Sequence, residues 1–404
     1  MGDFFQNGVI ATLHNLSGRS SKKIAEDLLT WSGDCPMTLI IPALYSEFEG
    51  AAMPKILSEL KKVNYLSEVI IGLDRADNEQ FKLVKKYCRD LPADCRIIWN
   101  DGPGMLRMQE DLSSRGLAPL ERGKGSNVWY AMGYFLASGK GKILALHDAD
   151  IFSYKREMLT RLLYPVVNPN FDYIFCKGYY PRVEQSGFQG RVARLLVTPL
   201  LRALKNVNGP DPFLDYLDSF RYPLAGEFAL DAEVVGGLRI PFDWGLEIGV
   251  LTEVFDAYPV NRICQVDIEN SYIHKHQEIS IEDPSEGLHR MAKDIVKSIF
   301  RRLSGDSGQL PQEFYRKVRV AYEKSAEDIL DSYVSDAEMN GYPMDVKQEE
   351  SLVALFSQTL TTVGENNLQS SGKLPLSPTW AVVSESMPGV LDRLKEIVDS
   401  ENSF

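Results

Sequence analysis

The sequence predicts an α/β fold with a mostly parallel central sheet, followed by a helical C-terminal extension. Over the first 150 residues, short apolar runs alternate with helical segments of 10 to 13 residues, which is typical of βαβ units. After about residue 286, nearly every segment has helical periodicity. The length of 404 residues suits two domains, or one large α/β domain with an accessory part.

The expected elements follow one another in a regular order. The first 36 residues are a polar arm with some helix, and then strands and helices alternate, with strands at 37–44, 68–74, 95–100 and 142–148 and helices at 51–63, 78–90 and 126–138. Beyond residue 150 we expect strands at 173–180 and 261–268 and a helix at 190–204 that Pro199 interrupts. The predicted divisions are therefore an N-terminal arm (1–36), a catalytic domain (37–285) and a helical extension (286–404).

Composition narrows the class of protein. A net charge of −12 and a pI near 5.1 do not favour nucleic acid or an anionic membrane surface as partner. Five scattered cysteines without a C-x-x-C pair indicate a reduced protein without a structural zinc site. The N-terminus lacks a signal-peptide pattern, and no apolar run approaches 18 residues. We therefore expect a cytoplasmic location.

Two carboxylates end the apolar segment "KILALHDAD" (142–150). Asp148 and Asp150 would repel each other at the end of a buried strand unless a cation joins them. A hard divalent cation bound by such carboxylates and by substrate phosphates is the usual arrangement for Mg²⁺ or Mn²⁺. The D-x-D pattern alone is also typical of an ordinary loop or helix cap.

Upstream, Lys124 lies between two glycines at the start of a predicted helix, where a positive charge and a helix N-terminus suit an anion. A plain surface turn is the alternative. Glu227 and Glu247 each lie in a Gly-containing apolar stretch, and buried carboxylates need partners. A structural role is nearly as good an interpretation for Glu227.

A basic island interrupts this acidic chain. Residues 176–194 contain Lys177, Arg182, Arg191 and Arg194, opposed only by Glu184. Such an island at a helix start suits an anionic substrate, although a solvated surface would look the same.

Several further stretches carry a family resemblance: "CKGYYPR" (176–182), "GRVARLLVTPLLRAL" (190–204), "LAGEFAL" (224–230), "WGLEIGVLTEVFD" (244–256) and "QVDIENSYIHKHQ" (265–277). With the Gly–Lys–Gly turn and the D-x-D pair, the chain resembles the retaining glucosyl-3-phosphoglycerate synthases and their mannosyl counterparts from about residue 37 to 300. This resemblance implies an A-type nucleotide-sugar glycosyltransferase fold, which is Rossmann-like, and a homodimer.

The resemblance also implies roles at the donor end. Pro42, Ala43 and Leu44 match the turn that binds the nucleotide base, and either Ser46 or Glu47 takes the place of an acidic residue there. Lys124 and Asp148 match donor-binding residues. Asp150 and His274 match metal ligands for Mg²⁺ or Mn²⁺, and catalysis is assigned to Glu247 and Asp150. From the residues alone, a lone histidine such as His274 is more often structural.

At the acceptor end, Gly190 and Arg191 match an acceptor-binding helix start, but the chain departs from the family pattern. Ala193 stands where the family has threonine, and His276 and Gln277 stand where it has Asn and Arg. We therefore hypothesise that the site either accepts unphosphorylated glycerate or rebuilds its phosphate contacts from Arg194 and His276.

The predicted function is a metal-dependent retaining hexosyl transfer, most simply of glucose from UDP-glucose, to 3-phosphoglycerate or glycerate in compatible-solute synthesis. No well-placed nucleophile is evident, which favours a front-face mechanism. The alternatives are mannosyl transfer from GDP-mannose, a nucleotidyltransferase, and an inactive nucleotide-sugar-binding scaffold. A nucleotidyltransferase normally has a basic, Gly-rich loop after its first strand, whereas "PALYSEFEG" is acidic.

Overall fold

The computed structural model describes residue 6 and residues 8–270, 272–273, 287–305, 309–369 and 376–403. These residues form an eight-stranded sheet in the order β1-β10-β6-β9-β5-β2-β3-β4, beside a small β7–β8 hairpin. The strands are β1 (Ala11–Leu13), β2 (Met37–Leu44), β3 (Leu66–Asp74), β4 (Asp94–Trp99), β5 (Ile143–Leu146), β6 (Phe175–Tyr179), β7 (Val183–Glu184), β8 (Gly187–Phe188), β9 (Phe228–Asp231) and β10 (Ile263–Asp267).

The helices before residue 270 are α1 (Ser21–Trp31), α2 (Tyr45–Glu49), α3 (Ala52–Leu60), α4 (Asn78–Cys88), α5 (Pro103–Ser114), α6 (Lys124–Ser138), α7 (Arg156–Val167), η1 (Val192–Val197), α8 (Thr198–Asn208), α9 (Pro212–Ser219), α10 (Ala232–Val235), α11 (Leu246–Ala257) and η2 (Val260–Arg262). The helices after residue 286 are α12 (Gly287–Leu303), α13 (Gln312–Asn340), α14 (Val346–Gln369), α15 (Trp380–Ser386) and α16 (Val390–Asn402).

One antiparallel strand sits inside an otherwise parallel sheet. β9 lies between β5 and β6 and runs opposite to both, while the other neighbouring strands of the sheet are parallel. The residues just before β9 therefore lie at the same edge of the sheet as the residues just after β5. This edge is where ligands collect in such folds.

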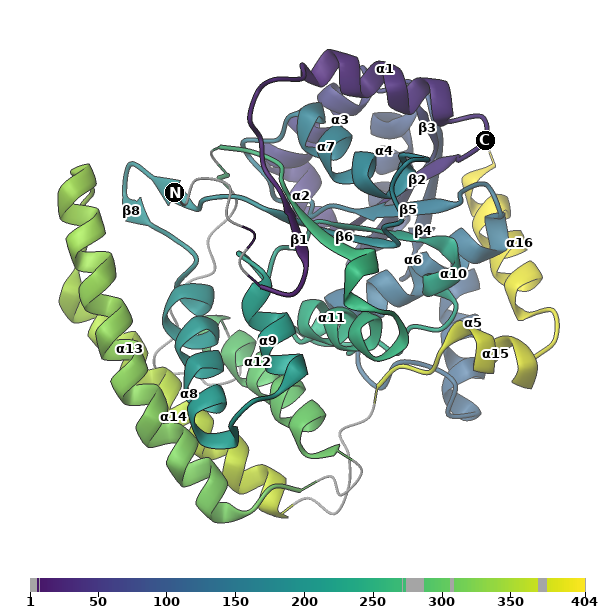
Figure 1. The fold of residues 1–404 in the computed structure, drawn as a ribbon. Helices are drawn as coiled ribbons and strands as arrows, with labels where there is room; N and C mark the ends of the chain where they lie inside the picture. The colour runs from purple at the N-terminus through teal and green to yellow at the C-terminus, as the bar shows by residue number, and fades with distance from the viewer. Residues whose placement is uncertain are drawn as a thin grey trace.

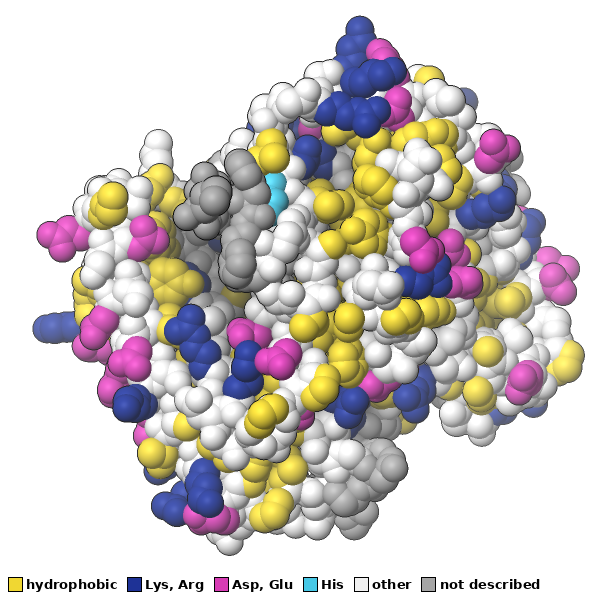
Figure 2. Space-filling model, in the orientation of Figure 1, with side chains coloured by type: hydrophobic (Ala, Val, Ile, Leu, Met, Phe, Trp, Pro, Cys, Tyr) yellow, Lys and Arg dark blue, Asp and Glu magenta, His cyan; other side chains and the backbone are white. Residues whose placement is uncertain are grey.

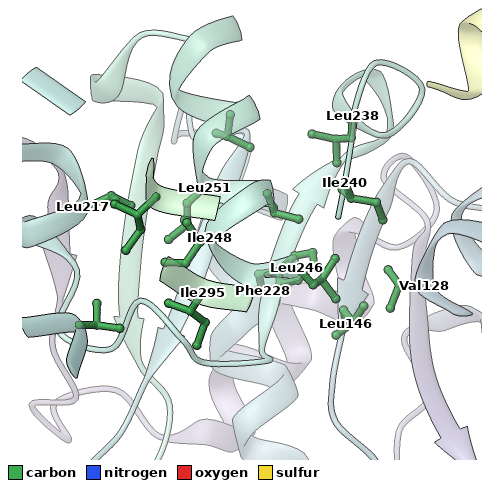
Figure 3. Close-up of a cluster of buried hydrophobic side chains, with 14 of the residues drawn as sticks. Val128, Leu146, Leu217, Phe228, Leu238, Ile240, Leu246, Ile248, Leu251 and Ile295 are labelled. Atoms are coloured by element: carbon green, nitrogen blue, oxygen red, sulfur yellow. The ribbon is translucent and has the colours of Figure 1, made fainter. Parts of the chain in front are cut away.

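Helices cover both faces of the sheet (Figure 1). α1, α3, α4 and α7 share one hydrophobic cluster, and α5, α6, α8, α9, α11 and α12 share the other. The central strands are apolar on both sides, as β2 shows with five consecutive buried residues, because a parallel sheet is covered on both faces. Figure 3 shows how β5, α6, β9 and α11 contribute Leu146, Val128, Phe228 and Leu246 to one cluster.

The C-terminal helices share that core. α13 and α14 pack against α8 and η1, and α16 packs against α6 and β4. Trp380 of α15 stacks on Trp129 of α6 with ring centroids 4.2 Å apart. The side chain of Asn402 accepts a hydrogen bond from Ile97 N and donates one to Ile97 O of β4. The segment after residue 286 thus wraps around the α/β part, and the predicted domain division stays a prediction.

The helix expected at 190–204 differs in its first turns. Residues of η1 form a wide π-helical turn before α8, and Pro199 is near the start of α8. A proline cannot donate to the carbonyl four positions earlier, here Leu195. The hydroxyl of Tyr322 on α13 donates to that carbonyl over 2.6 Å, so a C-terminal helix satisfies the oxygen that the proline leaves.

The expected strands and helices of the first 150 residues are present within one to three residues at most ends. The expected N-terminal arm also contains β1, which pairs with β10 at the edge of the sheet. On the face drawn in Figure 2, basic and acidic side chains are interspersed. Among the described residues, no helix is both long and apolar enough to cross a membrane.

Candidate active site

The two carboxylates of the D-x-D pair follow β5 at the ligand-binding edge of the sheet. His147 N donates to Ile40 O, which extends the β2–β5 pairing up to the acid pair. Gly226, just before β9, faces Asp148: an added Cβ would lie 2.2 Å from Asp148 Oδ2, so only glycine admits the carboxylate here. His147 itself is fully buried beside Tyr154, and burial lowers its pKa to about 3, so it is a neutral core residue.

Lys124, the first residue of α6, joins two carboxylates. Its Nζ lies 2.7 Å from Asp148 Oδ1 and 2.8 Å from Glu247 Oε1, and Glu247 is in the first turn of α11. The flanking glycines have a packing role, because a Cβ at Gly125 would come within 2.0 Å of Pro241 O and one at Gly123 within 2.6 Å of Phe242 O. The Gly–Lys–Gly turn is therefore pressed against the segment before α11, which brings Lys124 to Glu247.

The electrostatics of this cluster depend on burial and on close opposite charges. Burial alone lowers the pKa of Lys124, but the carboxylates of Asp148 and Glu247 outweigh it and hold the pKa above its ordinary value, so the lysine stays charged. Burial raises the pKa of Asp148, and Lys124 opposes that rise. Lys177 of β6 is a second, fully buried lysine close enough to interact with Glu247 and Asp148, and burial lowers its pKa to about 8.

Across from this cluster lies the helix start that contains the predicted acceptor residues. Gly190 has a positive φ of 70°, which lets the chain turn from β8 into η1. Arg191 Nε donates to Glu349 Oε1 on α14 over 2.8 Å, and Arg194 Nη2 donates to Glu349 Oε2 over 2.9 Å. Arg194 is buried and also donates to the carbonyls of Phe188 and Gln189.

A cavity of about 140 Å³ joins the two groups. On one side it is lined by Lys124, Asp148, Asp150 and Glu247, and on the other by Gln189, Gly190, Arg191 and Ala193, with Arg182, Tyr222 and Trp244 among the remaining lining residues. A second, larger cavity of about 610 Å³, between Arg239 and Arg302, lies elsewhere and contains none of these residues.

Comparison with known proteins identifies the family. No family model matches the sequence. A glucosyl-3-phosphoglycerate synthase of Persephonella marina is 42% identical over 403 residues, which cover all of both chains. Another, of Methanococcoides burtonii, is 33% identical over 98% of this chain and 96% of its own. The chain belongs to the glucosyl-3-phosphoglycerate synthase family. It is therefore a glycosyltransferase.

Solved glucosyl-3-phosphoglycerate synthases share the fold. Two crystal structures of the Mycobacterium tuberculosis enzyme, one with Mg²⁺ and UDP and one with Mn²⁺, UDP-glucose and phosphoglyceric acid, match with TM-scores of 0.54 at 20% identity. Each match covers 74% of this chain and 89% or 90% of the other. The predicted A-type glycosyltransferase fold is confirmed.

The predicted metal residues are only partly within the described chain. Asp148 and Asp150 line the cavity and offer the carboxylate oxygens that Mg²⁺ and Mn²⁺ take. Among the described residues, no group of three or more histidine, cysteine or acidic side chains forms a cation site. His274, the other predicted ligand, and His276, a predicted acceptor residue, lie outside the described residues. Among the described residues, the carboxylates of Asp148 and Asp150 are suitable ligands for the cation.

The predicted base-binding residues lie at the neighbouring strand end. Pro42, Ala43 and Leu44 end β2, and Ser46 and Glu47 are in the short helix α2 that follows. None of the five lines the 140 Å³ cavity, so a nucleotide would extend beyond it along the sheet edge. The choice between Ser46 and Glu47 stays open.

The structure favours the structural interpretation of Glu227. Tyr180 OH donates to Glu227 Oε2 over 2.7 Å and Tyr272 OH donates to Oε1 over 2.8 Å, and the two rings stack 3.6 Å apart. Burial, and then the charge of Asp148, raise the pKa of Glu227 to about 7. This carboxyl therefore anchors the chain just before His274.

Sequence reasoning missed Glu349 and the lining residues from α12. Leu288, Met291 and Ile295 of α12 close one side of the cavity. Their helical periodicity marks them only as an apolar face. Glu349 is one glutamate among several on α14, and no local pattern distinguishes it.

Proposed function

We propose that this enzyme transfers the glucosyl unit of UDP-glucose to 3-phosphoglycerate with retention of configuration, dependent on Mg²⁺ or Mn²⁺. One observation carries the proposal: a single cavity has the strand-end lysine and carboxylates on one side and Arg191 on the other. The names of the two full-length relatives, and the UDP-glucose and phosphoglyceric acid bound to the mycobacterial enzyme, support the same donor and acceptor.

Each residue has a distinct part in the proposed reaction. Lys124 binds the diphosphate side of the donor as a fixed positive charge. Asp150, with His274, would hold the cation, and Asp148 would orient both Lys124 and the donor. When bound, the cation neutralises the diphosphate and so makes it a better leaving group. Arg191 would take the negative charge of the acceptor.

Glu247 orients the acceptor hydroxyl and forms no covalent intermediate. Its Oε1 is held by Lys124 at 2.8 Å, which fixes the carboxylate and weakens it as a nucleophile. We therefore favour a front-face reaction. The acceptor oxygen forms a bond to the anomeric carbon, the bond from that carbon to the phosphate oxygen breaks, and the hydroxyl proton passes to the departing phosphate.

The test is a donor and acceptor matrix with purified protein and Mg²⁺. We expect UDP release from UDP-glucose that depends on 3-phosphoglycerate, with an α-linked product by NMR. GDP-mannose tests the mannosyl alternative. Slow UDP release that no acceptor accelerates would contradict the proposal.

The departures from the family pattern at Ala193, His276 and Gln277 left two hypotheses about the acceptor, and the pH dependence of kcat/KM distinguishes them. If His276 helps to bind the phosphate, kcat/KM for 3-phosphoglycerate falls as pH rises past about 7, because the imidazole loses its proton. With glycerate it does not fall. Measurement of kcat/KM for both acceptors from pH 6 to 9, in wild type and His276→Ala, separates the two hypotheses.

The homodimer and the cytoplasmic location also stay predictions, and sedimentation velocity tests the homodimer.

A further inference from the structure

A buried carboxylate of the C-terminal helices holds the acceptor helix. Glu349 on α14 is 3% exposed, and its two oxygens accept from Arg191 and Arg194, more than 150 positions earlier in the chain. A carboxylate bound at both oxygens by guanidinium donors is strongly held. Arg194 is fixed by further contacts. It donates to the carbonyls of Gln189 and Phe188, and its guanidinium lies over the ring of Tyr333, 4.8 Å from the centroid.

The anchoring leaves one side of Arg191 available. Its Nε donates to Glu349, and its Nη2 donates to Gln348 Oε1 over 3.1 Å. Nη1 has no hydrogen-bond partner among the described residues, and Arg191 lines the cavity opposite Lys124 and Asp150. A guanidinium is a planar fork of five N–H donors, so two fixed corners determine where the third points.

The backbone beneath Arg191 is also held by the C-terminal helices. η1 is a wide turn, and Tyr322 of α13 donates to Leu195 O within it. Without α13 and α14, the carbonyl of Leu195 would lose its donor and the two arginines would lose the carboxylate that they share. The helices after residue 310 are thus part of what gives the acceptor helix its shape.

We propose that Glu349 is a positioning residue for the acceptor: by bridging Arg191 and Arg194 it fixes Arg191 with Nη1 toward the cavity, where it receives the anionic group of the acceptor. The proposal rests on the proposed function. An anchored arginine has already lost the rotamer freedom that binding would otherwise cost, so Glu349 strengthens acceptor binding although it has the same sign of charge as the acceptor.

The experiment compares Glu349→Gln with Glu350→Gln, an exposed glutamate next to it on α14. We expect Glu349→Gln to raise KM for 3-phosphoglycerate about tenfold, with kcat and KM for UDP-glucose within about twofold, because Glu349 contacts Arg191 and Arg194 and not Lys124 or the D-x-D pair. Glu350→Gln should match wild type. In an Arg191→Ala background, Glu349→Gln should add little, since Glu349 acts through Arg191.

Other outcomes overturn the proposal. A lower melting temperature with unchanged KM values would mean that Glu349 only stabilises the fold. A lower acceptor KM would mean that Glu349 competes with the acceptor for Arg191. If Glu349→Gln does not fold, Glu349→Asp withdraws the carboxylate from both arginines by one methylene, and an unchanged acceptor KM in that variant refutes the proposal. If wild type itself releases no UDP in response to 3-phosphoglycerate, the proposed function fails first.

Discussion

The two sides of the cavity have opposite arrangements of charge. At the strand ends, one lysine is shared by Asp148 and Glu247, with Asp150 close by. At the acceptor helix, one glutamate is shared by Arg191 and Arg194. Each side fixes its charges with a single opposite charge at the centre, and under the proposed function the strand ends take a cation and the helix takes an anion.

The difference between the sides lies in where the central charge comes from. Lys124, the D-x-D pair and Glu247 all belong to the α/β part of the chain, whereas Glu349 comes from the helices that follow it. The described residues of the proposed donor side thus all lie in the sheet and its helices. The acceptor side depends on α14, so acceptor binding is expected to respond to changes in the C-terminal helices while donor binding is not.

The largest effect is expected when a carboxylate of the D-x-D pair is removed. Asp150→Asn should lower kcat by roughly a hundredfold or more, since changes even to groups that only orient metal ligands cost about 10–100-fold. Its melting temperature should stay close to wild type, because a side chain at a cavity wall contributes little packing. Asp148→Asn should be milder. Full activity of Asp150→Asn in the presence of a chelator would contradict a metal site here.

A smaller loss is expected when the shared lysine is removed. Lys124→Met should lower kcat/KM for UDP-glucose by about 30–150-fold, equivalent to roughly 2–3 kcal/mol for lost charged contacts. KM for the acceptor should change less. Asp148 and Glu247 would then lack their shared cation, so Mg²⁺ should raise the melting temperature more than it does in wild type.

The control for this change is Lys22→Met, at an exposed position in α1. It should leave both the kinetics and the response to Mg²⁺ unchanged. Wild-type donor kinetics in Lys124→Met would show that the Gly–Lys–Gly turn serves packing alone.

The smallest effect is expected on stability, from Glu227, which is hydrogen-bonded to two tyrosines and to neither charge cluster. Its folded pKa of about 7 lies above the ordinary value of 4.5, so the folded state holds the proton more tightly. Its contribution to stability is therefore present below about pH 4.5 and is lost as pH rises to about 7. Glu227→Gln should flatten the fall in the free energy of unfolding between pH 5 and 7.5 by on the order of 2 kcal/mol, which a denaturant titration at each pH measures.

Glu350→Gln, which changes an exposed carboxyl, should keep the wild-type dependence on pH. An equally steep fall in Glu227→Gln would assign the pH dependence to another buried group, and Asp148 would be the first to test.

The α/β part of the chain could be predicted from the sequence better than the contacts that the C-terminal helices make with it. β2 has the predicted bounds, and the D-x-D pair lies at the predicted strand end, because both depend on local apolar patterns. The antiparallel β9 was not predicted, since a four-residue strand that runs directly into the short helix α10 leaves little periodicity. Arg194 was predicted as an acceptor residue from charge alone. Its burial against Glu349 depends on a contact between distant segments, which no window of sequence contains.

The hydrogen bonds of Asn402 have a consequence for how the protein behaves in a crowded solution. β4 is the last strand of the sheet, and an uncovered outer strand offers its peptide groups to strands of other molecules. Asn402 occupies the amide and carbonyl of Ile97, and α16 lies along β4. α16 thus covers part of this edge of the sheet, which disfavours edge-to-edge aggregation there. A chain cut before α15 is expected to lose solubility even with every active-site residue in place.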